Sequence, residues 1–194
     1  MVVAGPIAPP PAHLDPEYRA ILLRVGECLA AWSHVEHALQ RLFVQIMAPD
    51  DANVPRVFSA VISFETRLAM VNALIERDTD AAFQESWNAT YNKLSLLHRR
   101  RHQVAHFTMV WNATEARYVL APFFTWGKTP ILAKQLTSQN LRARVASFDR
   151  AERRVNRLYL YVLHRQGKLP ENALQEGDPA GLLQMPTDQS HEEI

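Results

Sequence analysis

The chain of 194 residues contains a single cysteine and no long apolar run. Cys28 therefore has no partner for an internal disulfide, and no window approaches the roughly 20 apolar residues that span a bilayer. The first residues also lack the basic stretch and apolar core of a secretion signal. These absences argue against a disulfide-stabilised secreted scaffold and a membrane protein. We expect a soluble, cytoplasmic protein with no membrane partner.

The charge is low overall but uneven along the chain. Hydrophobic residues make up 47% and charged residues 21%, which is typical of a globular protein with a real core. The net charge is +1, yet the residues from Gly167 onward hold six acids against Lys168 alone and carry −5. Residues 1–166 therefore carry +6. This balance favours a polyanionic partner, although solvated arginines on helix surfaces are the ordinary explanation.

Composition also divides the chain into three parts. Prolines gather near the amino-terminal end, at Pro6, Pro9, Pro10, Pro11 and Pro16. They predict a flexible arm over residues 1–16. The acidic, broken segment 167–194 predicts a disordered tail. Residues 17–166 between them are predicted to form one helical bundle.

Four amphipathic segments predict the helices of this bundle. The first runs from Glu17 to Ala48, and its apolar positions alternate steps of four and three: Ile21, Val25, Cys28, Trp32, Val35, Leu39, Leu42 and Ile46. Cys28 lies on this stripe, so we expect a buried, inert thiol rather than a nucleophile.

The second helix is predicted from about Pro55 to Arg77, with a possible break at Ser63 and with Ile62 among its inward residues. Asp80 is a suitable cap for the third helix. The inward line of that helix reads Phe83, Trp87, Thr90, Leu94, Leu97, Arg101 and Val104. Thr137 or Ser138 can cap the fourth helix, which Gly167 and Pro170 stop.

Two short runs rich in β-branched and aromatic residues follow the third helix, Phe107 to Trp111 and Tyr118 to Phe123. They predict a β-hairpin. A loop is expected at Gly127-Lys128-Thr129-Pro130. The predicted fold is therefore all-α: a four-helix up-down bundle with a short β-hairpin or loop insertion between helices three and four.

Charged residues occupy two positions where an apolar residue is expected. Glu36 lies in line with Trp32 and Leu39 on the first helix, and Arg101 continues the inward line of the third. Burying a charge is unfavourable by several kcal/mol unless the charge is paired. One interpretation is a structural ion pair between Glu36 and Arg101 or His102, and a functional interpretation is compatible with it.

Histidines cluster around Arg101. His98, His102 and His106 follow one another at steps of four, so a continuous helix would place them on one face, where they could bind zinc. Zinc sites usually gather ligands from more than one element, however, and the chain has no Glu-x-x-His pair of the kind that builds di-iron bundles. We predict neither a metal nor another cofactor.

Arginine and histidine can also act on RNA without a metal, because the 2′-hydroxyl of RNA itself attacks the adjacent phosphate. The protein must then remove one proton, supply another and stabilise charge on the phosphate. An imidazole titrates near neutral pH and a guanidinium fork binds phosphate, so one Arg and one His are a sufficient minimum.

The segment Arg101-His102-Gln103-Val104-Ala105-His106 is an Arg-x4-His arrangement at the end of the third predicted helix. It resembles the Arg-x(4 to 6)-His signature of the HEPN superfamily. The resemblance covers about residues 17–166 and includes an inward acid on the first helix, here Glu36. The signature most often has a polar residue such as Asn directly after the Arg, where this chain has His102.

HEPN proteins are small helical bundles, many of them metal-independent endoribonucleases of toxin-antitoxin, abortive-infection and CRISPR systems. Their motif Arg and His typically meet at a dimer cleft. The resemblance thus implies single-stranded RNA as substrate, a homodimer, and an antitoxin or other protein partner.

In this interpretation four residues form the catalytic set. His106 is the general acid or base, Arg101 binds the scissile phosphate, and Glu36 orients Arg101 or His102. The residues expected to attract the RNA backbone are Lys93, Arg99 and Arg100. The alternative is a non-catalytic HEPN-like dimer that binds a partner protein and holds Arg101 in a structural ion pair.

Overall fold

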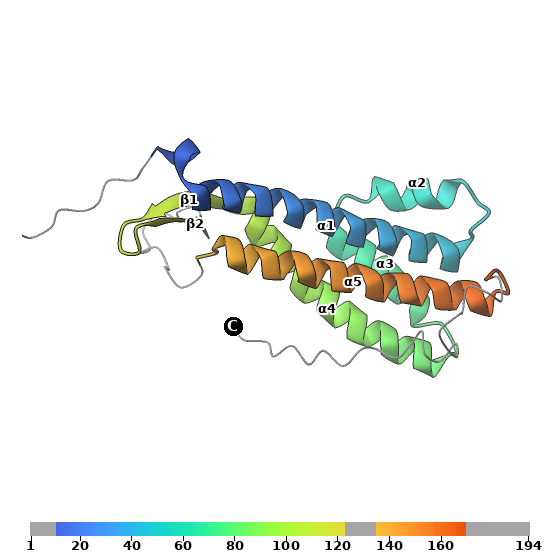
Figure 1. The fold of residues 1–194 in the computed structure, drawn as a ribbon. Helices are drawn as coiled ribbons and strands as arrows, with labels where there is room; N and C mark the ends of the chain where they lie inside the picture. The colour runs from blue at the N-terminus through green and yellow to red at the C-terminus, as the bar shows by residue number, and fades with distance from the viewer. Residues whose placement is uncertain (1–10, 123–134, 170–194) are drawn as a thin grey trace, which may run out of the picture. The chain divides into compact units, whose positions relative to one another are not determined.

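The computed structural model describes residues 11–122 and 135–169. This part of the chain is mostly helical and carries a small two-stranded antiparallel sheet, as predicted (Figure 1). Its elements are η1 (Ala12–Leu14), α1 (Pro16–Met47), α2 (Asn53–Ala60), α3 (Phe64–Ile75), α4 (Ala81–His106), β1 (Phe107–Asn112), β2 (Arg117–Pro122) and α5 (Ser138–Arg165).

Most of the predicted arm and tail, and the predicted loop at residues 127–130, lie outside the described residues. Within the predicted arm, Ala12–Leu14 forms a 3-10 turn. Contacts between residues divide the chain into two compact units. The first unit is Met1–Ser33 with Leu97–Asp149, and the second unit is His34–Leu96 with Arg150–Ile194. Helices α1, α4 and α5 contribute residues to both.

Helix α1 confirms the first predicted helix. Asp15 caps it, because its Oδ1 accepts a hydrogen bond from the backbone N–H of Tyr18 at 2.9 Å. Pro16 takes the first helical position, where its missing N–H costs nothing. The expected stripe is buried at Ile21, Cys28, Trp32, Val35, Leu39 and Leu42, and half-buried at Val25 and Ile46.

The second predicted helix is two helices, α2 and α3. The backbone is extended at Val61 and Ser63, and the Ser63 hydroxyl accepts from the N–H of Thr66 at 3.3 Å to cap α3. The expected break is thus confirmed, but the inward placement of Ile62 was wrong. Ile62 is 95% exposed. It lies in the extended link between α2 and α3, so the helical spacing that predicted an inward side chain does not apply to it.

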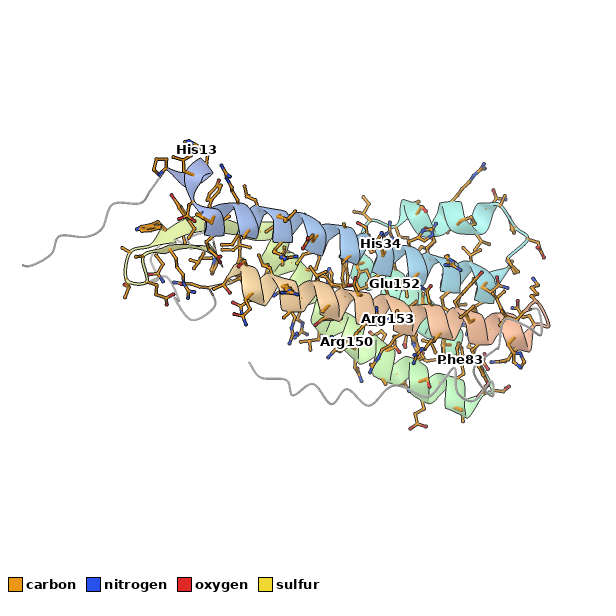
Figure 2. All side chains as sticks on the ribbon, viewed as in Figure 1. His13, His34, Phe83, Arg150, Glu152 and Arg153 are labelled. Atoms are coloured by element: carbon orange, nitrogen blue, oxygen red, sulfur yellow. The ribbon has the colours of Figure 1, made fainter. Side chains whose placement is uncertain are left out.

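Side chains of the second unit secure the start of α4. Oδ1 of Asp80 accepts from the N–H of Phe83 at 3.0 Å, which confirms the predicted cap. The ring of Phe83, labelled in Figure 2, stacks on Tyr161 of α5 with centroids 5.6 Å apart. Trp87 Nε1 donates to Asn72 Oδ1 at 2.9 Å. The start of α4 is therefore held by both α3 and α5.

The β-hairpin of the first unit follows α4 without an intervening residue. Its strands pair antiparallel from Phe107 with Pro122 to Asn112 with Arg117, which confirms the prediction. The Asn112 side chain accepts from two backbone N–H groups of the turn. The turn is completed by Ala116, whose φ of 47° lies in the left-handed region.

Helix α5 begins and ends as the sequence predicts. Thr137 Oγ1 accepts from the N–H of Asn140 at 3.3 Å and caps the helix. Glu17 of α1 accepts from both the N–H and the hydroxyl of Ser138, each at 3.0 Å. At the other end Gly167 has a φ of 65° and its N–H donates to the carbonyl of His164, a conformation that glycine adopts without strain.

Candidate active site

Two of the predicted catalytic residues, His102 and His106, lie together on the last turns of α4. Both side chains are exposed, and their rings are 4.1 Å apart between centroids, tilted by 45°. The spacing of four residues places them one helical turn apart on the same face. The end of α4 therefore presents two neighbouring imidazoles to solvent.

Arg101 precedes this pair and lies on the inward line of α4, as predicted. It is half-buried between the buried positions Leu97 and Val104. Its Nε is fully buried and has no hydrogen-bond partner among the described residues. Leaving such a donor unpaired costs on the order of 1–3 kcal/mol, so this position of Arg101 is unfavourable for the stability of the described fold.

Another arginine, Arg144 of α5, contacts this part of α4 and was not predicted. Its Nη1 donates to the backbone carbonyl of Arg100 and its Nη2 to Oε1 of Gln103, both at 2.7 Å. Burial, together with the nearby charge of Arg100, lowers the pKa of Arg144 to about 10. The two acceptors are neutral, so they orient the guanidinium without neutralising it.

The sequence did contain a signal for Arg144. It stands three residues after Leu141 and four before Phe148, which are both buried on the inward face of α5. The steps of three and four that singled out Arg101 apply to Arg144 as well. The first unit thus holds two arginines at positions where its helices otherwise place apolar side chains.

Three acidic side chains of the first unit are engaged elsewhere. Glu27 pairs with Arg24 at 2.5 Å, Glu115 pairs with Arg117, and Glu17 bonds Ser138. None of the carboxylates described in this unit forms an ion pair with Arg100, Arg101 or Arg144. Within the described part of the first unit, the arginines at the end of α4 are therefore not paired with a carboxylate.

Glu36 forms its salt bridge with a residue that the sequence did not indicate. Its Oε2 lies 3.9 Å from Nη1 of Arg67 on α3, within the second unit. Arg67 also donates to the carbonyls of Val61 and Ser59, so it closes the link between α2 and α3. The orienting role of Glu36 toward Arg101 or His102 stays a prediction.

The predicted RNA-attracting residues divide between the two units. Arg99 is exposed and Arg100 half-buried, and both belong to the first unit with Arg101. Lys93 is half-buried and belongs to the second unit. The structure thus brings together Arg99, Arg100, Arg101, His102 and His106 on one stretch of α4, whereas Lys93 and Glu36 lie in the other unit.

The zinc alternative finds no support at this cluster. His98 lies against Trp32, with ring centroids 6.0 Å apart. Within residues 11–122 and 135–169, no group of three or more His, Cys, Asp or Glu side chains is arranged to hold a metal ion. The histidines of α4 are therefore interpreted by their proton chemistry.

Cys28 is buried, as predicted. It is 1% exposed, and its Sγ donates to the carbonyl of Leu141 at 3.4 Å. Burial raises the pKa of this thiol to about 11. Since the thiolate is the nucleophile, Cys28 is unsuited to covalent catalysis.

Comparison with known proteins adds no relative. No family model, curated protein or solved structure matches the chain. In the described part of the chain, every helix is too short or too polar to cross a membrane. The function is therefore inferred from the residues of the site themselves.

Proposed function

We propose that this protein is a metal-independent endoribonuclease of HEPN type that cuts single-stranded RNA. The observation that carries the proposal is the exposed pair His102 and His106, with rings 4.1 Å apart, on the same helix as Arg101, whose buried Nε has no partner among the described residues. Two proton-transferring groups and a phosphate-binding group are what metal-free RNA cleavage requires.

Cleavage in this proposal is an internal transfer. One imidazole removes the proton from the 2′-hydroxyl, whose oxygen forms a bond to the adjacent phosphorus. The bond from phosphorus to the 5′-oxygen breaks, and an imidazolium gives that oxygen its proton. The products are a 2′,3′-cyclic phosphate and a free 5′-hydroxyl. We assign His106 the principal acid or base role and His102 the complementary one.

Arg101 stabilises the charge that develops on the phosphate. A guanidinium presents N–H donors in a fork that matches phosphate oxygens, and it stays charged throughout the working pH range. Its half-buried position limits its motion, so the donors are oriented before substrate binds. The exposed Arg99 and its neighbour Arg100 attract the RNA backbone by charge.

The wider setting of the proposal follows the HEPN resemblance. It comprises a four-helix up-down bundle with a hairpin insertion, a cytoplasmic homodimer, and a role in a toxin-antitoxin or phage-defence system with a neutralising protein partner. Light scattering of the purified protein tests the dimer. The predicted roles of Glu36 and Lys93 stay predictions beside this core.

Cleavage is tested with purified protein and a labelled single-stranded RNA in EDTA. We expect cutting with cyclic-phosphate ends, its loss in Arg101→Ala and His106→Ala, and a large decrease in His102→Ala. The matched controls are His34→Ala and Arg153→Ala, two exposed residues of the second unit that Figure 2 labels. Circular dichroism checks that helicity is retained. Cutting that survives both Arg101→Ala and His106→Ala overturns the proposal.

The alternative function is a non-catalytic HEPN-like binding protein with Arg101 in a structural ion pair. That interpretation requires a carboxylate at Arg101. Among the described residues, Nε of Arg101 has no hydrogen-bond partner and no carboxylate of the first unit forms an ion pair with Arg101, which favours the nuclease over it.

A further inference from the structure

Arg144 has no role in the proposed reaction, although it contacts the part of α4 that contains Arg101. It reaches from α5 to α4 and bonds the turn that contains Arg101. A guanidinium has five N–H donors. Two of them bond the carbonyl of Arg100 and the amide oxygen of Gln103, so three remain for a further acceptor.

A second cation accompanies Arg144. Arg100 and Gln103 are three residues apart and so lie on one face of α4, and Arg144 bonds both residues. After burial, the charge of Arg100 also lowers the pKa of Arg144. Two like charges held near each other in a partly buried place repel, and the described carboxylates of this unit are not paired with either. An anion bound between them would relieve both the repulsion and the loss of solvation.

We infer that Arg100 and Arg144 together form a phosphate-binding subsite, which binds a backbone phosphate of RNA next to the one held at Arg101. Phosphate is the anion that suits it, because planar guanidinium groups donate paired hydrogen bonds to tetrahedral oxyanions. Arg100 and Arg101 are adjacent on α4, so neighbouring phosphates of one strand can be bound together. The identity of the ligand as RNA rests on the proposed function, whereas phosphate binding itself does not.

A purely structural role for Arg144 makes a different prediction. In that case Arg144 only ties α5 to α4, through a backbone carbonyl and a neutral amide. Arg100→Gln separates the two roles, because it removes the Arg100 charge and leaves the carbonyl that Arg144 bonds. Since Arg100 also attracts the RNA backbone by its charge, its variant is compared with Arg99→Gln, at the exposed neighbour. A structural tie would weaken anion binding equally in Arg100→Gln and Arg99→Gln, and a phosphate subsite would weaken it more in Arg100→Gln.

The test uses the full chain and a fluorescent single-stranded DNA oligonucleotide, which lacks the 2′-hydroxyl and cannot be cut by the proposed route. Anisotropy gives the affinity of Arg144→Gln, Arg144→Lys, Arg100→Gln and Arg99→Gln across a range of salt concentrations. The matched control is Arg142→Gln, an exposed arginine two residues before Arg144 on the same helix. Melting in inorganic phosphate, against sodium chloride at equal ionic strength, reports binding of the anion alone.

We expect Arg144→Gln and Arg100→Gln each to weaken oligonucleotide binding about tenfold. Each should also reduce the slope of log affinity against log salt by about 0.7, the value for one phosphate contact on a single strand. Arg144→Lys should be intermediate because it keeps the charge and loses the fork. Arg142→Gln should stay within about twofold, and stabilisation by phosphate should disappear in Arg144→Gln.

Unchanged affinity and salt slope in folded Arg144→Gln and Arg100→Gln would overturn the subsite. If Arg144→Gln does not fold, the difference between Arg100→Gln and Arg99→Gln decides. The outcome is separable from that of the nuclease proposal. RNA cleavage with unaltered oligonucleotide binding in the variants would overturn the subsite only, and weakened binding without any RNA cleavage by the native chain would support the subsite and overturn the nuclease.

Discussion

The hydroxyl of Tyr161 donates a hydrogen bond to Oδ2 of Asp80 at 2.5 Å, so the carboxylate that caps α4 is also bound by α5. The other oxygen of Asp80 accepts from the N–H of Phe83, and Arg165 lies 3.7 Å away. One side chain thus joins the start of α4 to the last turns of α5.

These bonds make stability depend on pH at Asp80. The Tyr161 hydrogen bond first, and the Phe83 N–H next, lower the pKa of Asp80 from its ordinary 3.8. A lowered pKa in the folded state stabilises the fold above the unfolded value, and this stability is lost as pH falls through the folded value. We expect Asp80→Asn to reduce the free energy of unfolding by about 1 kcal/mol at pH 7 and by much less near pH 2. Urea unfolding at both pH values measures the difference, with exposed Asp50→Asn as control. An equal effect at both pH values would contradict it.

We expect Arg101 to be required for RNA cleavage and to lower the stability of the fold. Its buried Nε has no partner among the described residues and lies on an apolar line, so Arg101→Leu removes an unsatisfied donor and adds apolar contact there. We expect the free energy of unfolding to rise by about 1 kcal/mol while RNA cleavage is lost. Arg99→Leu, on an exposed neighbour, should leave stability within about 0.5 kcal/mol. Urea unfolding decides between this view and a structural Arg101, whose loss would destabilise the protein.

The Cys28 thiol should resist modification while the chain is folded. With its pKa raised to about 11 by burial, only about one thiol in a thousand is ionised at pH 8. We expect a disulfide reagent to react with the native protein at least about 100-fold more slowly than with the same protein in 8 M urea, because the difference in ionisation alone slows the reaction by about two orders of magnitude. The protein unfolded in urea is the control. Comparable rates in both states would show that the thiol is accessible.

The turn of the hairpin offers a stabilising substitution. Ala116 has a φ of 47°, where a Cβ is unfavourable and glycine is not. Ala116→Gly should therefore raise the free energy of unfolding by about 0.5–1 kcal/mol. Ala113→Gly, in the same turn and without a positive φ, should lower it. The two variants are compared by thermal melting, and the same sign of change in both would refute the explanation.

Periodicity in the sequence was enough to predict most of the fold. The steps of three and four locate α1, α4 and α5, because burying one face of a helix leaves that mark on the chain. The caps at Asp80 and Thr137 and the β-branched runs of the hairpin carry local signals of the same kind. The inward placement of Ile62 was wrong because the helical spacing does not apply to an apolar residue in an extended link.

The candidate site was only half predictable for a related reason. A pattern shows that Arg101 or Glu36 faces inward, but it does not show which side chain it meets. The salt bridge of Glu36 with Arg67, and the bonds of Arg144 to α4, join residues 31 and more than 40 positions apart. Such partnerships depend on how helices pack, and no spacing within a single helix records them.

The junction of α4 and β1 constrains how this chain can vary. His106 is the last helical residue and Phe107 the first residue of the strand. One added residue in the last turn would rotate His106 by about 100° relative to His102, or would exchange the two faces of β1. We therefore expect an insertion or a deletion between positions 102 and 107 to disrupt the site, even at positions that tolerate substitution. Descendants of this chain that keep the paired imidazoles should also keep the length of this segment.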